Sequence, residues 1–199
     1  MHFKLMPQRI GALIDGIFAI VMTILVLDIK VPHETSMLTN FELEQFLSGQ
    51  FQDIIVYMTV FILLGHIWVN LHNRAHYIRY TDTIHVWLNI FFLMFVALLP
   101  FSSALVNKFA GDSVASVFLA GNVFLIGVFG EWSWIYATHN RRLVDDALSD
   151  AEIAVEKRRA VVLPVVSLCA MVIAFIWPLA SSYVLLIAPI IISLIRKKR

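Results

Sequence analysis

Long apolar segments separated by short polar connections dominate the chain of 199 residues. A helix needs about 20 mostly apolar residues to cross about 30 Å of hydrocarbon. Residues 1–199 therefore predict a single all-α membrane domain with six transmembrane helices: Ile10–Val31, Ile54–Leu71, Ile84–Val106, Val114–Ala137, Val161–Leu179 and Ser182–Ile195. The last segment is short and contains Pro189, so its assignment needs support from the charges.

The basic residues favour six helices with both termini in the cytoplasm. Lys and Arg are enriched in cytoplasmic loops, and with six crossings thirteen of the 15 Lys and Arg residues fall on one side. Only Lys30 and Lys108 fall on the other side. A five-helix topology would place the basic sequence of residues 196–199 outside. The first apolar segment is also too long for a cleaved signal peptide and lacks a cleavage site of small residues. We therefore predict a multi-pass protein of the cell membrane.

Two connections have features of their own. Residues Thr39–Gln50 begin with Thr-Asn-Phe-Glu, which resembles a capping box and predicts a short outer helix. Residues Asn140–Ala160 place small and apolar side chains three or four positions apart with charges between them. This spacing predicts an amphipathic cytosolic extension between the fourth and fifth transmembrane helices, with its charges facing solvent.

Composition excludes several classes of protein. With 60% apolar residues, 15% charged residues and a mean hydropathy of +0.82, the chain is not a soluble domain. A net charge of +1 does not favour a nucleic-acid partner. A single cysteine, Cys169, rules out an intrachain disulfide, and we expect it to be buried. His72 and His76 lack a third ligand at a suitable spacing, so we predict no metal site, no cofactor and no enzyme activity.

A few ionisable residues fall inside the apolar segments, where they are costly unless paired or hydrated. They are Asp15, His66, His72 and Glu131, and we expect His66 to be hydrogen-bonded. Arg9 and Asp15 are six residues apart and so face different sides of one helix, which means that each needs a partner on another helix or subunit. A structural network and a direct role in ion conduction are both consistent with this pattern.

An aliphatic stripe runs along the first segment: Ile20, Ile24 and Leu27 follow the i, i+4, i+7 spacing of one helix face. Thr23 lies beside the stripe and Asp28 near its outer end. Such a stripe most often faces lipid or a protein core, and its spacing alone does not indicate an ion path.

Residues 9–28 resemble the first-helix motif of the prokaryotic relatives of the lysosomal potassium channel, transmembrane protein 175. That motif is Arg, three residues, then Phe-Ser-Asp; Arg9 and Asp15 match it, while Leu13 and Ile14 replace the Phe and Ser. Residues 65–72, Gly-His-Ile-Trp-Val-Asn-Leu-His, are similar to the Trp and His cluster of the family's second helix. Residues 87–102 are similar to its third helix.

The resemblance implies a homotetramer in which the first helix of each subunit lines a central pore that has no re-entrant filter loop. The expected function is that of a potassium-permeable cation channel, with potassium ions, three further copies and the lipid bilayer as partners. Ile20 then matches the narrowest hydrophobic constriction, and Ile24 and Leu27 match further apolar rings. Thr23 matches the hydroxyl layer associated with potassium preference. Asp28 would attract cations to the outer mouth.

The same resemblance matches Arg9, Asp15 and His72 to a network that ties the first helix to its neighbours. Two other functions remain as alternatives. One is a proton-coupled membrane transporter in which Asp15, His72 and Glu131 form a relay. The other is a scaffold protein that transports nothing. We expect no Gly- or Pro-broken helix pair of the kind found in carriers with inverted repeats.

Overall fold

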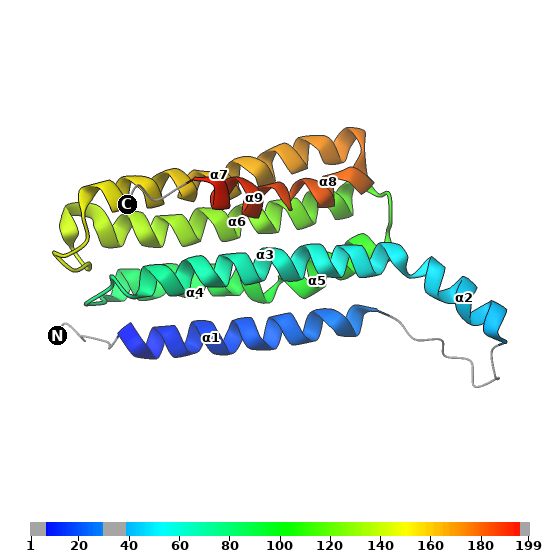
Figure 1. The fold of residues 1–199 in the computed structure, drawn as a ribbon, viewed down its shortest axis with the longest axis horizontal. Coiled ribbons are helices and arrows are strands. Elements are labelled where there is room, and N and C mark those ends of the chain that lie inside the picture. Colours follow the sequence, from blue (N-terminus) through cyan, green and yellow to red (C-terminus); the bar gives the residue numbers. More distant parts are fainter. Residues whose placement is uncertain (1–6, 30–38, 196–199) are drawn as a thin grey trace.

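The computed structural model describes residues 7–29 and 39–195, which form a bundle of helices (Figure 1). In chain order its elements are α1 (Pro7–Ile24), η1 (Leu25–Asp28), α2 (Asn40–Gly49), α3 (Phe51–Ala75), α4 (Thr83–Ala97), α5 (Leu99–Lys108), α6 (Ser113–Thr138), η2 (His139–Arg141), α7 (Asp150–Ile176), α8 (Pro178–Val184) and α9 (Ile187–Leu194). The elements η1 and η2 are 3-10 turns.

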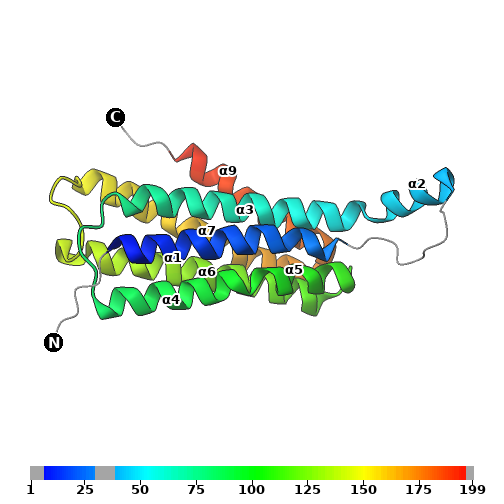
Figure 2. The ribbon, with the colours of Figure 1, turned by 90° about the horizontal axis from the view of Figure 1, so that it is seen from below.

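The long helices lie side by side and alternate in direction along the chain (Figures 1 and 2). By length and composition, five helical stretches could cross a membrane: Pro7–Asp28, Phe51–Ala75, Thr83–Lys108, Ser113–Arg141 and Asp150–Ile176. They overlap the first five predicted segments, but the fifth helix begins earlier than predicted, at Asp150, and ends at Ile176, so the predicted end at Leu179 lies in α8. The expected end of the first segment at Val31 lies outside the described residues, as do Lys4, Lys30 and the basic residues 196–199.

The sixth predicted segment corresponds to α8 and α9, which run back along the bundle (Figure 1). Together they span Pro178–Leu194, which is shorter than the other five stretches. At about 1.5 Å per residue, 17 residues cover about 25 Å, less than the usual hydrocarbon thickness. A sixth crossing and cytoplasmic termini therefore stay predictions.

The predicted outer helix is present as α2. The Thr39 hydroxyl accepts a hydrogen bond from the Glu42 N–H, and the Glu42 carboxylate accepts one from the Thr39 N–H, so the capping box is complete. Because these bonds favour the charged carboxylate, the Thr39 N–H lowers the pKa of Glu42. Figure 1 shows α2 projecting beyond the end of the bundle. Phe41 and Leu47 are exposed on it.

The predicted amphipathic extension is only partly helical. Asn140 and Arg141 adopt positive φ angles of 50° and 52°, which end the helical run after α6. Leu143 then lies in a loop, buried in a small second cluster with Trp134, and its carbonyl accepts a hydrogen bond from the Arg79 N–H. A new helix starts only after Ser149, which caps α7, so the second half of the extension and the fifth transmembrane helix form one continuous helix.

Helices α6 and α7 pack closely because a glycine faces a proline. A Cβ atom added to Gly127 would lie 2.9 Å from Cδ of Pro164, closer than carbon atoms normally approach. Gly127 therefore leaves the space that the Pro164 ring occupies within α7. The contact brings the middle of α6 against the middle of α7.

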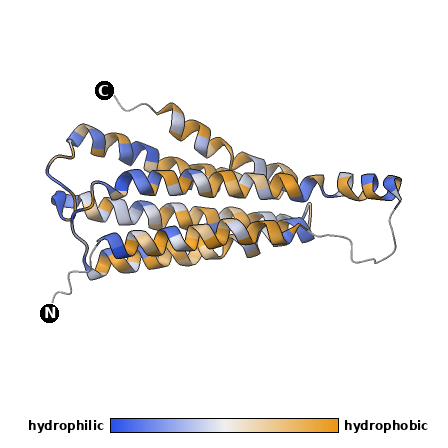
Figure 3. Ribbon diagram, turned by 60° about the horizontal axis from the view of Figure 1, so that its bottom comes forward, coloured by the Kyte–Doolittle hydropathy of each residue, from blue (hydrophilic) through white to orange (hydrophobic). Residues whose placement is uncertain are grey.

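Apolar side chains fill the bundle and also cover its outside. Phe18 on α1 stacks on Phe92 on α4, with ring centroids 6.2 Å apart, inside a core that all the long helices share. Many large apolar side chains are exposed on the long helices. Figure 3 shows the apolar residues, in orange, along most of the length of these helices. Cys169 is exposed on α7, so the expectation that it is buried is wrong. This exterior is typical of a protein that has lipid as its solvent.

Candidate functional site

The first helix buries one side against its own chain and leaves the other side open. The buried side consists of side chains that are at most 4% exposed: Phe18, Val21 and Leu25. On the open side lies the aliphatic stripe, in which Ile20 is 57%, Ile24 42% and Leu27 76% exposed. The described residues of its own chain therefore leave much of the stripe uncovered.

Thr23 lies on the same open side, and its hydroxyl group bonds to its own helix. Oγ1 donates to the carbonyl oxygens of Ala19, at 3.0 Å, and of Ile20, at 2.8 Å. Because the hydroxyl hydrogen is used in this way, the lone pairs of Oγ1 remain as acceptors. Thr23 can thus present an oxygen atom to a cation.

Asp28 ends the turn η1 and is half-buried against α5. The Ser103 hydroxyl lies 3.5 Å from its Oδ2 atom, and Ser103 also donates to the carbonyl of Pro100. The carboxylate thus lies at the end of the stripe, as the sequence indicates, but next to a neighbouring helix of its own chain.

Asp15 has a partner on another helix. The indole Nε1 atom of Trp68 on α3 donates a 2.8 Å hydrogen bond to Oδ1 of Asp15. The Trp68 ring contacts the His72 ring at 5.4 Å between centroids, and His72 contacts His76 at 5.2 Å. The structure therefore brings Asp15 and His72 together through Trp68.

Arg9 lies apart from these residues. Its side chain is exposed near the start of α1, and among the described residues it takes part in no ion pair. Of the three residues assigned to the network, Asp15 and His72 are connected within one chain, whereas Arg9 points outward.

A buried ion cluster lies between α3, α6 and α7. The Arg74 guanidinium contacts Glu131 at 3.1 Å and Glu156 at 3.2 Å, and it also stacks over the Trp134 ring. Glu156 is bound in addition by Arg159 at 3.0 Å. Arg74 and Glu156 are less than 10% exposed, and the two positive and two negative charges of the cluster balance.

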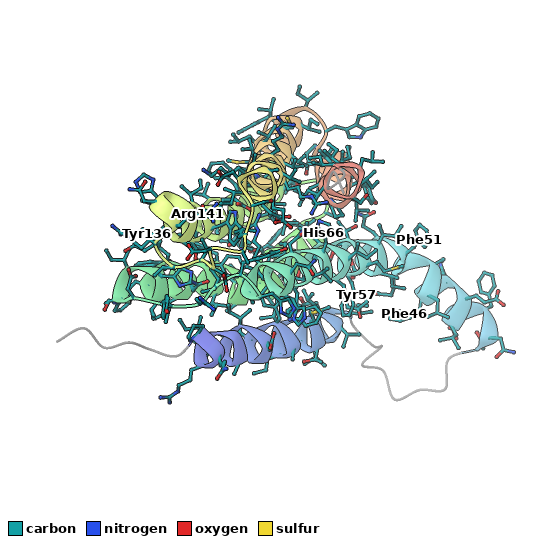
Figure 4. All side chains as sticks on the ribbon, turned by 60° about the vertical axis from the view of Figure 1, so that its left-hand side comes forward. Phe46, Phe51, Tyr57, His66, Tyr136 and Arg141 are labelled. Carbon is teal, nitrogen blue, oxygen red and sulfur yellow. The ribbon has the colours of Figure 1, made fainter. Side chains whose placement is uncertain are left out.

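The cluster continues toward the last helix. Arg159 donates to the carbonyl oxygen of Ile195, at 2.7 Å, beyond the end of α9. Beside it lies a cavity of 40 Å³ that is lined by His66, Asn70 and Arg159 among others. The buried Nε2 atom of His66, labelled in Figure 4, has no hydrogen-bond partner among the described residues, so the expectation of a hydrogen-bonded His66 is wrong.

Sequence reasoning missed the members of this cluster that α7 supplies. Glu156 and Arg159 fall in the segment that was expected to present its charges to solvent, and that expectation is wrong for both. A signal did exist: Arg74 and Glu131 stand in or next to apolar segments, and a buried Arg requires carboxylates around it. The sequence does not reveal which acidic residue completes the set.

A second polar contact joins α4 to α6 at the end of the bundle where α1 begins. Asp82 caps α4 by accepting from the His85 N–H, and its carboxylate also accepts a 2.7 Å hydrogen bond from the Tyr136 hydroxyl. Burial alone would raise the pKa of Asp82, but these hydrogen bonds outweigh it and lower the pKa. Figure 4 shows Tyr136 at one end of the molecule, with Phe46 on α2 at the other.

These features define a multi-pass α-helical membrane protein whose first helix leaves an apolar face open and is held by an Asp–Trp contact to the second long helix. The sequence model of a family described as the endosomal/lysosomal potassium channel TMEM175 matches residues 9–100. A potassium channel of Chamaesiphon minutus is 31% identical over 139 residues, which cover 68% of each chain. The chain belongs to the TMEM175 family.

Other relatives match a smaller share. A potassium channel of Streptomyces collinus is 34% identical over 108 residues, 54% of this chain and 51% of that relative, so the chain spans about half of its length. The endosomal/lysosomal proton channel TMEM175 of Gallus gallus is 31% identical over 114 residues, 55% of this chain and 23% of the relative.

A solved structure is similar over almost the whole chain. The crystal structure of a lysosomal potassium-selective channel TMEM175 homolog from Chamaesiphon minutus superposes with a TM-score of 0.81. The superposition covers 94% of this chain and 96% of the other, at 27% sequence identity. The likeness therefore includes α6 to α9, beyond the residues that the family model matches.

Proposed function

We propose that the chain is the subunit of a potassium-permeable cation channel of the cell membrane, in which four copies surround a central path with their α1 helices. In this assembly the aliphatic stripe faces the axis and Ile20 forms the narrowest constriction. Ile24 and Leu27 form wider apolar rings, and both termini lie in the cytoplasm. A pore of this kind has no chemical step, so we expect no enzyme activity.

The exposure of the stripe is the observation that carries the proposal. A single chain leaves Ile20, Ile24 and Leu27 open while it buries the opposite side of the same helix. The names of the bacterial relatives, which are potassium channels, support an ion path over a lipid-facing surface. At the axis of an oligomer, other copies of the chain would cover the stripe, and the stripe would line the ion path.

The geometry of α1 determines how such a pore would select ions. An intact helix uses its carbonyl groups internally, so they cannot replace the hydration shell of an ion as a carbonyl filter does. Apolar rings instead impose a dehydration barrier. A ring of Thr23 hydroxyl oxygens, with their hydrogens directed to the carbonyls of Ala19 and Ile20, would offset part of that barrier for a cation. We therefore expect moderate selectivity.

The Asp15–Trp68 hydrogen bond is the contact that would position α1 in the assembly. Through it α3 would hold the inner half of the pore helix, and the His72 ring contacts the Trp68 ring. Arg9, which is exposed near the start of α1, is then available to a neighbouring copy. Asp28 would lie at the outer mouth and concentrate cations there.

The test is potassium flux through proteoliposomes that contain Ile20→Asn. Replacing an apolar ring by amides should hydrate the constriction and raise the flux severalfold. Val26→Asn is the matched control, because Val26 is also an exposed aliphatic residue, at 46%, but it lies in η1 and points about 80° away from Ile20 in ideal geometry. If both variants conduct like the wild type, Ile20 does not form the constriction.

A second candidate ion is the proton, because the Gallus gallus relative is named a proton channel. The same vesicles, loaded with a pH-sensitive dye, measure proton flux in parallel with potassium flux. A proton-coupled carrier with Asp15, His72 and Glu131 as its relay is less well supported, since Glu131 is ion-paired with Arg74, whereas Asp15 and His72 contact Trp68. Single-channel currents would exclude the carrier, and no flux of either ion would favour the scaffold.

A further inference from the structure

We propose that a crevice between α1 and the rest of the bundle binds the phosphate group of an anionic phospholipid. The crevice has a volume of 470 Å³, which is in the range of small-molecule sites. It lies at the end of the bundle where α1 begins and α3 ends, the end at which a lipid headgroup region is expected. Its walls come from α1, α3, α4, α6 and the α3–α4 connection.

The polar lining of the crevice combines basic groups with uncharged polar side chains. Its basic residues are three histidines and two arginines: His72, His76, His85, Arg74 and Arg79. Among the described residues that line it there is neither Asp nor Glu. Arg74 is neutralised by the buried cluster, whereas Arg79 is 60% exposed and paired with Asp145 at the surface. This set of side chains suits an anion.

One of the residues that line the crevice carries a buried donor without an acceptor. Trp134 is 3% exposed and lines the crevice, and its Nε1–H group has no hydrogen-bond partner among the described residues. Leaving such a donor unpaired costs free energy, so an acceptor oxygen within reach of it would be bound favourably. Phosphate oxygens are acceptors of this kind.

The rest of the lining is apolar and favours a lipid over a free anion. Ile10 and Ile14 on α1 face Leu71 on α3 and Ile78 after it. Such walls would hold the glycerol backbone and the start of an acyl chain, while the phosphate lies among the basic groups. Helix α1 forms one wall of the crevice, and α3, α4 and α6 form the others. A bound lipid would therefore contact all four helices and hold α1 against the other three.

Binding can be measured on the purified full-length protein in detergent, without any ion flux, so its failure is distinguishable from failure of the proposed channel. The probes are dioctanoyl phosphatidylglycerol, dioctanoyl phosphatidylcholine and inorganic phosphate, and the readouts are native mass spectrometry and the shift in thermal unfolding. We expect phosphatidylglycerol to bind at least about tenfold more tightly than phosphatidylcholine, which is zwitterionic. This is the difference in affinity expected for one charge-assisted contact.

Two variants test whether the crevice is the site. Arg79→Gln removes its exposed charge, and Gly11→Leu fills it, since a Cβ atom at Gly11 meets no other atom within 4 Å. Both should lower the affinity for phosphatidylglycerol about tenfold. The controls are Arg158→Gln and Gly16→Leu, which remove an exposed charge and enlarge an open glycine outside the crevice, and they should bind like the wild type.

Three results would overturn the proposal. Equal affinity for both lipids would exclude recognition of the anionic headgroup. An equal loss in Arg79→Gln and Arg158→Gln would indicate general attraction to a basic surface. A thermal shift with inorganic phosphate as large as that with phosphatidylglycerol would assign the crevice to a soluble anion.

Discussion

Removal of Arg74 should destabilise the protein far more than removal of the neighbouring Arg79. Arg74→Met leaves Glu131 without a partner and Glu156 with only Arg159, in a cluster that is less than 20% exposed at every side chain. Breaking a buried ion pair by removing one partner costs about 3–5 kcal/mol. Arg79 is 60% exposed in its pair with Asp145, and such pairs contribute about 0–1 kcal/mol.

A double variant gives the sharper test of this reasoning. Adding Glu131→Leu to Arg74→Met removes the carboxylate that lost its only partner and leaves Glu156 and Arg159 as a balanced pair. The double variant should therefore be more stable than Arg74→Met alone, by about 1–3 kcal/mol, the cost of an unsatisfied buried group.

The assay is reversible unfolding in mixed detergent micelles at a fixed protein concentration, because assembly would couple stability to concentration. The reasoning would be refuted if Arg74→Met were no less stable than Arg79→Met. It would also be refuted if adding Glu131→Leu lowered the stability further, since the cost would then come from lost packing and not from unbalanced charge.

Three further variants test contacts elsewhere in the bundle with the same unfolding assay. Gly127→Ala should lower the stability by about 1–3 kcal/mol because its Cβ would lie 2.9 Å from a proline ring of α7. Gly121→Ala, whose Cβ would have its nearest neighbour at 3.9 Å, should lower the stability less, and equal effects would contradict close helix packing. Trp68→Phe should cost about 1 kcal/mol by removing the donor to Asp15, and no loss would mean that this hydrogen bond does not hold α1. Folding lowers the pKa of Asp82, so its charge stabilises the fold above the unfolded pKa of about 4, and this contribution is lost as the pH falls through the lower folded pKa. The loss of stability caused by Asp82→Asn at pH 7 should therefore become smaller toward about pH 3. A loss that stays constant with pH would refute the charge effect.

Local signals in the sequence predicted the elements that depend on local physics. The capping box of Thr39 and Glu42 fixes the start of α2, and long apolar runs identify the five long stretches. The stripe was visible because its members lie within eight residues on one helix face. Its relation to an axis, in contrast, involves other copies of the chain and stays a proposal.

The parts that sequence reasoning missed depend on contacts between distant residues. Arg74 and Glu156 are 82 positions apart, and nothing near Glu156 distinguishes it from the solvated charges beside it. The loop after α6 is decided by Asn140 and Arg141 at positive φ and by the burial of Leu143 against the α3–α4 connection. Only the packed structure provides these partners.

The 3-10 turn η1 couples the length of the first helix to the direction of its last side chains. In ideal geometry a 3-10 turn places residues i and i+3 one above the other, so Leu27 is aligned with Ile24. The four residues Leu25–Asp28 are also about 2 Å longer than they would be as α-helix, because each rises about 0.5 Å more. Conversion of this one turn would thus shorten the helix by about 2 Å and swing Leu27 by about 60°, with no movement of the buried half that holds Phe18.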